Sequence, residues 1–132
     1  MTTRKARCSC GQLTLTCEGA PTRVSICHCR ACQRRTGSVF GTQARFARDQ
    51  VTAAGRATQY NRSGDSGGRI TFHFCPDCGA TLYWEPDGLP DAVVVAVGAF
   101  ADPDFPPPAV SVYEARRHAW AALPDVALER MD

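Results

Sequence analysis

Seven of the eight cysteines in this 132-residue chain fall into three tight groups, and this clustering constrains the fold more than any other feature. The groups are Cys8/Cys10, Cys27/Cys29/Cys32 and Cys75/Cys78. Zinc in proteins prefers four tetrahedral ligands at about 2.0–2.3 Å, and two thiolates on one tight turn can occupy two of the four corners. The clustering therefore predicts metal ligands rather than disulfide partners.

The start of the chain favours a reducing compartment. Residues Met1 to Arg7 are polar and basic, and no apolar signal segment follows them. The longest apolar run, Ala92 to Ala101, is about half of the roughly 20 residues that a membrane span needs. We therefore expect a cytoplasmic protein with no membrane partner. Disulfides are rare in that compartment, which disfavours a disulfide-linked secreted domain.

Length and charge exclude further classes. The chain is short enough to be one domain over residues 1–132, and its 44% hydrophobic and 21% charged residues are ordinary for a globular protein. The formal net charge of +2 is too small to predict nucleic-acid binding.

The pattern of short alternating segments predicts a mainly β fold. Alternation of apolar and polar residues is typical of half-buried strands, and glycine and proline separate these segments. Strands are expected at 13–17, 24–26, 38–40, 43–46, 57–60, 69–74 and 81–84, and from Ala92 onward. A loop or hairpin tip is expected at 61–68 and an extended connector at 102–108. The one helical pattern is short and lies near the C-terminus, at Glu114–Ala122.

The spacing of the cysteines divides them into four and three. In Cys75-Pro-Asp-Cys78-Gly79 the proline presets one backbone dihedral, and the glycine allows a positive φ after the second thiolate. A glycine also follows Cys8 and Cys10. Pairing these two motifs closes one four-thiolate site and leaves Cys27, Cys29 and Cys32 as a second group. Three protein ligands with an open fourth position are typical of catalytic zinc.

Other interpretations of the middle group remain open. The three cysteines can form a redox centre, or His28 can complete a closed structural site. Cys17 ends an alternating strand and is expected in the core. His28 and His73 are the candidates for a general base, although a strand-face role is expected for His73.

Three arginines lie within and just after the middle group. A zinc ion with three thiolates carries a formal charge of −1, so an incoming anionic thiol needs cations nearby. Arg30, Arg34 and Arg35 are predicted to bind its carboxylates, for which arginine is better suited than lysine.

The motifs resemble the glutathione-dependent formaldehyde-activating enzyme family, which includes the centromere protein V-like proteins. The resemblance covers about residues 5–125. It rests on the three cysteine motifs, on Thr36-Gly37-Ser38-Val39-Phe40 after the second motif, and on Ala119-Trp120 near the C-terminus. The chain departs from the family pattern at Val97–Asp102 and Arg117–Trp120.

The resemblance implies a zinc-bound complex β domain of the Mss-four-like type. It also implies a structural zinc on Cys8, Cys10, Cys75 and Cys78, and a catalytic zinc on Cys27, Cys29 and Cys32. The activity it implies is a carbon–sulfur lyase reaction, written in reverse as the condensation of formaldehyde with glutathione to S-hydroxymethylglutathione.

We therefore expect a zinc-dependent carbon–sulfur lyase that acts on an aldehyde adduct of glutathione or a related small-molecule thiol. The alternative is a non-enzymatic zinc module that binds a protein or a thiol. An open second metal site favours the enzyme, and a closed site with four protein ligands favours the module.

Overall fold

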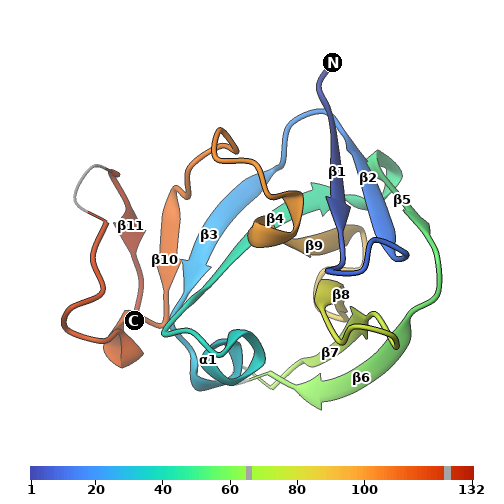
Figure 1. Ribbon diagram of the computed structural model, residues 1–132. Helices are drawn as coiled ribbons and strands as arrows, with labels where there is room; N and C mark the ends of the chain where they lie inside the picture. The colour runs from blue at the N-terminus through green and yellow to red at the C-terminus, as the bar shows by residue number, and fades with distance from the viewer. Residues whose placement is uncertain (65–66, 124–125) are drawn as a thin grey trace.

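The computed structural model describes residues 1–64, 67–123 and 126–132, and it confirms a mainly β architecture (Figure 1). The strands are β1 (Thr3–Arg7), β2 (Thr14–Glu18), β3 (Arg23–Cys27), β4 (Gly41–Ala47), β5 (Val51–Ala54), β6 (Thr58–Ser63), β7 (Arg69–Phe74), β8 (Thr81–Pro86), β9 (Ala92–Ala96), β10 (Val110–Val112) and β11 (Glu129–Arg130). The α-helix α1 spans Arg30–Thr36, and single 3-10 turns lie at Arg48–Gln50, Val97–Phe100 and Glu114–Arg116.

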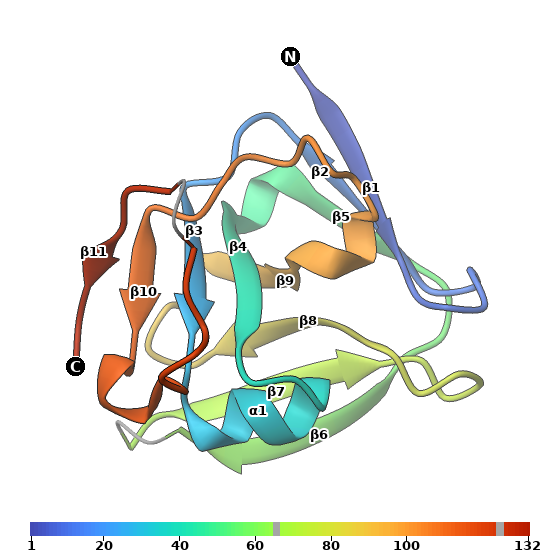
Figure 2. The same cartoon turned by 60° about the vertical axis from the view of Figure 1, so that its left-hand side comes forward.

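The strands form two sheets. One has the order β1-β2-β5, and the other has the order β11-β10-β3-β4-β9-β8-β7-β6. The pairs β10–β11 and β10–β3 are parallel, whereas the other pairs are antiparallel. In Figures 1 and 2 the small sheet lies at one end of the molecule and α1 at the other, beside β6 and β7.

The main core lies between the two sheets. It includes Leu13, Leu15 and Cys17 from the small-sheet side, and Phe46 and Val95 from the large sheet. Cys17 is fully buried there, which confirms the core position expected for it. Burial raises the pKa of its thiol to about 11.

The opposite face of the large sheet forms a separate apolar surface. Because successive side chains alternate between faces, Val93 and Val95 face the core while Val94 packs with Phe72 and Trp84. Both faces of β9 are therefore covered, which explains why its sequence is continuously apolar. The expected strand from Ala92 ends at Ala96, and a 3-10 turn follows it.

The helices differ from the sequence-based expectation. The expected helix at Glu114–Ala122 is wrong beyond its first turn: the 3-10 turn ends at Arg116, and Arg117 is extended with φ −65° and ψ 134°. The α-helix lies instead at Arg30–Thr36, where only Cys32 is buried, so no amphipathic pattern marks it.

The expected strand at 38–40 is also wrong, because this segment is the exit from the helix. Gly37 ends α1 with φ +71°, and the Ser38 backbone N–H donates to the Thr36 hydroxyl. The other expected strands are present. The hairpin tip expected at 61–68 begins later than predicted, because β6 continues to Ser63, and residues 65 and 66 lie outside the described residues.

Candidate metal centres and the adjoining cavity

The two outer cysteine motifs meet in space, although about half of the chain separates them. The sulfurs of Cys8, Cys10, Cys75 and Cys78, here called the outer group, all lie within 4.8 Å of one another. The Cys10 sulfur is 3.6 Å from those of both Cys8 and Cys75. Sulfurs at the corners of a tetrahedron with 2.3 Å metal–sulfur bonds are about 3.8 Å apart, so this donor set fits a metal ion with four thiolates.

The turns that present the outer group have the backbone conformation expected from their glycines. Gly11 has φ +86° and Gly79 has φ +80°. In each turn the glycine N–H bonds back to the first cysteine of its motif, Gly11 to the Cys8 carbonyl and Gly79 to the Cys75 carbonyl. A side chain with a Cβ is strained in this region, which is why a glycine follows each pair.

Hydrogen-bond donors surround the sulfurs of the outer group. The Leu13 N–H is 3.3 Å from the Cys8 sulfur, and the side-chain amide of Gln12 is 2.9 Å from the Cys75 sulfur. Burial opposes ionisation of Cys75, but donation from Gln12 and from the N–H groups of Cys78 and Asp77 lowers its pKa to about 6. The surroundings of Cys75 therefore stabilise its thiolate, the form that binds metal.

Gln12 is a further residue of this site that was not expected from the sequence. Its amide also exchanges two hydrogen bonds with the Arg56 backbone, at 2.8 and 2.9 Å. Its only sequence signal is its position directly after Cys8-Ser-Cys10-Gly11, and the partner segment is more than forty residues away.

The second group, here called the trio, consists of Cys27, Cys29 and Cys32. Their sulfurs also lie within 4.8 Å of one another, and all three residues are buried. Cys27 ends β3, Cys32 lies in α1, and Cys29 caps the N-terminus of that helix, its sulfur accepting the Cys32 N–H at 3.3 Å. The first turn of the short helix therefore brings Cys29 and Cys32 together.

In the absence of a metal, the three thiols of the trio alter one another's pKa. Hydrogen bonds donated by the Cys27 and Cys32 thiols lower the pKa of Cys29, while burial acts in the opposite direction. The pKa of Cys27 is raised because its thiol is hydrogen-bonded to Cys29 and Cys32 and because it is buried. Because the three sulfurs lie within 4.8 Å of one another, this donor set fits a metal cation in place of the shared protons.

His28 does not face the trio. Its Nε2 lies 3.0 Å from the Ser111 hydroxyl and 3.2 Å from a Glu114 carboxylate oxygen, and its ring contacts Phe40 edge-on. Among the described residues, the metal-competent cluster therefore contains three cysteines and no histidine. This arrangement disfavours a closed four-ligand site with His28.

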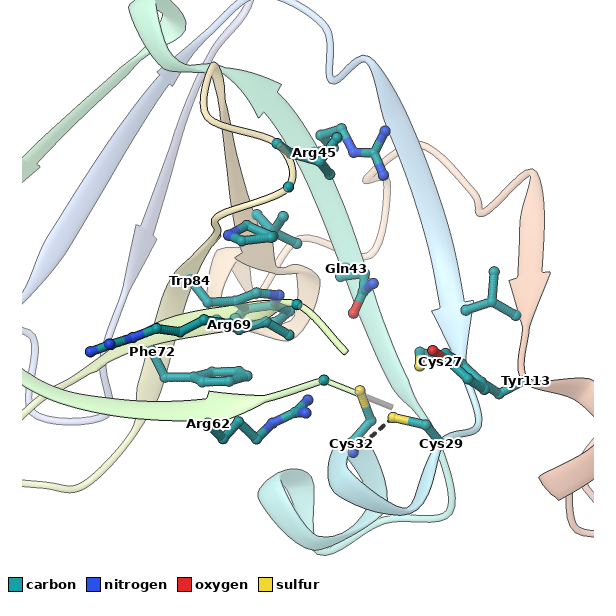
Figure 3. A pocket seen from close by; sticks show the side chains of 18 of the residues that line it. Cys27, Cys29, Cys32, Gln43, Arg45, Arg62, Arg69, Phe72, Trp84 and Tyr113 are labelled. Atoms are coloured by element: carbon teal, nitrogen blue, oxygen red, sulfur yellow. Dashed lines mark hydrogen bonds between the residues drawn. The ribbon is translucent and has the colours of Figure 1, made fainter. Parts of the chain in front are cut away.

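A cavity of about 520 Å³ adjoins the trio (Figure 3). Phe72, Trp84 and Val94 form an apolar wall, and Gln43 lies between the trio and Arg45. The basic side chains of the lining are Arg23, Arg45, Arg62 and Arg69, and they outnumber its acidic residue, Asp132. The volume is in the usual range for small-molecule sites, and the charge of the lining suits an anionic ligand.

The comparisons with known proteins agree with these motifs. Residues 3–116 match the family model described as glutathione-dependent formaldehyde-activating enzyme. The chain belongs to this family. No curated protein sequence matches it significantly.

One solved structure also supports the fold of this family member. A crystal structure of a Rhodobacter sphaeroides protein, a structural-genomics target, superposes with a TM-score of 0.57. The alignment covers 72% of this chain and 85% of that one at 20% sequence identity, so the likeness concerns the fold. Within the described residues, no helix is long and apolar enough to span a membrane.

In this member of the glutathione-dependent formaldehyde-activating enzyme family, the arginines expected to bind substrate lie on α1. Arg30 and Arg34 are exposed, and Arg34 and Arg35 line a neighbouring hollow between α1 and β6–β7. The Arg35 guanidinium is 4.3 Å from the centre of the Trp84 ring, on the wall of the cavity. Arg62 lines both spaces and extends toward Cys32 in Figure 3. Substrate binding by Arg30, Arg34 and Arg35 stays a prediction.

His73 has the structural position expected from its sequence context. Its Nε2 is 2.6 Å from a Glu85 carboxylate oxygen, and its ring stacks on Tyr83 at 4.3 Å. Arg48 pairs with the other Glu85 oxygen at 2.6 Å. Because both histidines considered as bases are engaged away from the cavity lining, neither is assigned a proton-transfer role.

Proposed function

We propose that both cysteine groups bind zinc. In the outer group, four thiolates and their N–H donors support a closed structural site. In the trio, three buried thiolates support a second site whose fourth position is left to a ligand other than the protein. Because the trio offers three protein ligands and the outer group offers four, zinc at the trio is expected to be the more labile.

We further propose that the protein is a carbon–sulfur lyase-type enzyme acting on an aldehyde adduct of glutathione or a related thiol. The observation that carries this proposal is the position of the trio: three sulfurs, with His28 turned away, adjoin a cavity lined by four arginines. The family description names glutathione and formaldehyde, which supports a thiol and a small aldehyde as substrates.

The chemistry is an addition without oxidation or reduction. In the direction of synthesis, a carbon–sulfur bond forms, the carbonyl becomes an alcohol, and the proton of the thiol ends on the new hydroxyl oxygen. Bound zinc would favour the thiolate form of the substrate sulfur. The chain itself would contribute the apolar wall of Phe72, Trp84 and Val94, which excludes water, and the Arg62 guanidinium, which offsets the negative charge beside the trio.

The remaining sequence predictions belong to the same proposal. They are a single domain over residues 1–132, a cytoplasmic location, and a small-molecule partner rather than nucleic acid or membrane. The helix arginines Arg30, Arg34 and Arg35 remain candidate contacts for the substrate, Arg34 and Arg35 from the neighbouring hollow.

The proposal is tested by Cys29→Ala, with Cys17→Ala as the matched control. Cys29→Ala should lose one zinc equivalent and any acceleration of S-hydroxymethylglutathione formation, while the fold is kept. Cys17→Ala removes a buried cysteine outside both groups and should keep both zinc equivalents and the rate. Because thiols add to formaldehyde without an enzyme, each rate is compared with the uncatalysed one, by exchange NMR.

The alternative function is a non-enzymatic zinc module. It predicts two zinc equivalents and no rate above the uncatalysed reaction in any variant. A wild-type protein that binds zinc at the trio but does not accelerate adduct formation would favour the module over the enzyme.

A further inference from the structure

Two arginines face each other directly across neighbouring strands at one end of the cavity. Arg23 on β3 is the register partner of Arg45 on β4. Side chains directly opposite in an antiparallel pair point to the same face with their Cβ atoms about 4.5–5.5 Å apart, and like charges there destabilise the sheet. Both residues line the cavity.

Asp132 lines the same cavity, but within the described parts of the chain no carboxylate forms an ion pair with Arg23 or Arg45. The Arg23 Nε is buried, and no described residue is its hydrogen-bond partner. Burial, and then the charge of Arg23, lower the pKa of Arg45. Both arginines are half-buried, so solvent relieves the repulsion only in part. A bound anion would satisfy both guanidinium groups.

The strand geometry relates this pair to the trio. Arg23 and Cys27 lie four residues apart on one face of β3, which corresponds to about 13 Å between their Cα atoms. Gln43, two residues before Arg45 on β4, projects into the cavity between the two ends (Figure 3). The face of the β3–β4 pair therefore presents cysteine, amide and guanidinium groups in a row.

We propose that Arg23 and Arg45 form an anion subsite that binds a carboxylate of the substrate thiol at the end of the cavity away from the trio. This inference rests on the proposed function for the position of the sulfur and adds the residues that would hold the far end of the substrate. In glutathione the sulfur is carried by the central residue, so each carboxylate is separated from it by the cysteine side chain and about one further residue, roughly 3.5 Å or more. In cysteine itself the carboxylate is only two carbons from the sulfur. Since the guanidinium groups cover part of the 13 Å, a peptide-sized anionic thiol reaches both ends, and cysteine or a small neutral thiol does not.

The test is the binding of four probes to the zinc-loaded protein by calorimetry: glutathione, S-methylglutathione, 2-mercaptoethanol and inorganic phosphate. Arg45→Gln should weaken glutathione and S-methylglutathione at least tenfold and leave 2-mercaptoethanol unchanged, because one charge-assisted contact is lost. Lys5→Gln removes the same charge from the exposed face of β1 and should change none of these affinities.

The melting temperature of the unliganded variant distinguishes an effect of Arg45→Gln on ligand binding from an effect on folding. Because Arg45→Gln relieves repulsion with Arg23, the unliganded variant should melt no lower than the wild type, which excludes a merely structural role. Unchanged glutathione affinity in Arg45→Gln, or no binding of either glutathione probe by the wild type, would overturn the subsite. Phosphate binding as tight as that of S-methylglutathione, and equally dependent on Arg45, would assign the pair to a free anion and also overturn it.

A separate variant tests the proposed function. Cys29→Ala should weaken glutathione, whose sulfur is free, more than S-methylglutathione. If Cys29→Ala changes neither affinity while Arg45→Gln weakens both, the anion subsite stands and the role of the trio in binding the substrate sulfur is wrong.

Discussion

Replacing Gln12 by alanine should weaken zinc binding at the outer group without touching a metal ligand. The Gln12 amide makes three contacts: it donates to the Cys75 sulfur at 2.9 Å and exchanges two hydrogen bonds with the Arg56 backbone. The first contact stabilises the thiolate directly. The other two hold the loop after β5 against the cysteine turn.

The magnitude follows from the charge of each partner. A hydrogen bond to a charged group contributes about 1.5–3 kcal/mol, and a neutral one about 0.5–1.5 kcal/mol. Loss of the donor to the Cys75 thiolate should therefore lower zinc affinity by about tenfold to a hundredfold, since 1.4 kcal/mol corresponds to a factor of ten. Loss of the two neutral bonds to Arg56 should lower the free energy of unfolding by about 1–3 kcal/mol in addition.

Gln50 offers a matched control. Its side chain also makes three hydrogen bonds, accepting from the Ala47 N–H at 2.7 Å and donating to the Glu18 and Ala20 carbonyls at 2.9 Å each. None of these partners is a cysteine, so Gln50→Ala should reduce stability but leave zinc affinity unchanged. Competition with a chromophoric chelator measures the affinity, and denaturant unfolding measures the stability. Equal zinc affinity in the two variants would refute the reasoning.

Three further outcomes are expected. Cys78→Ser should lose the outer zinc and much of the folded structure, because metal binding free energy at a structural site is folding free energy. Circular dichroism and the zinc content measure this. A variant that lacks one zinc but melts like the wild type would contradict it. A mild chelator should remove zinc from the trio before the outer group, so a single release step coupled to unfolding would speak against two distinct sites. Burial opposes ionisation of Glu85, but Arg48 and His73 lower its pKa, so its stabilisation is present above the ordinary pKa and is lost as the pH falls through the lowered value. Glu85→Gln should therefore destabilise the protein at pH 7 and approach the wild type below about pH 4; a difference that is independent of pH would contradict this.

The cysteine grouping was accessible from sequence because its signal is local. Two thiolates on a tight turn that ends in glycine need only a few consecutive residues, and the positive φ of Gly11 and Gly79 is the conformation that those residues predict. Most of the longer strands were accessible for the same reason, since alternation is a property of neighbours. The expected strand at 38–40 is absent, and β1, β5, β10 and β11 were not predicted.

The helix was misplaced because its stabilising contacts are not periodic. Only Cys32 of α1 is buried, and the N-cap is Cys29, which is not among the usual capping residues. By contrast, the segment after Glu114 has helical composition, but Glu114 itself bonds to Ser111 and Arg130, and the chain leaves the helical conformation at Arg117. Tertiary contacts overrode local propensity in both places.

The sequence by itself determined the family, the mainly β fold and the division of seven cysteines into four and three, because each depends on residue types at short spacings. The tertiary structure alone decided which charged side chains share a space with the trio. Arg34 and Arg35 are near Cys32 in sequence, yet they face the hollow beside α1, whereas Arg23 and Arg45 line the cavity because the β3–β4 register brings them opposite each other. Strand register joins residues that are distant along the chain, and spacing within one segment carries no information about it.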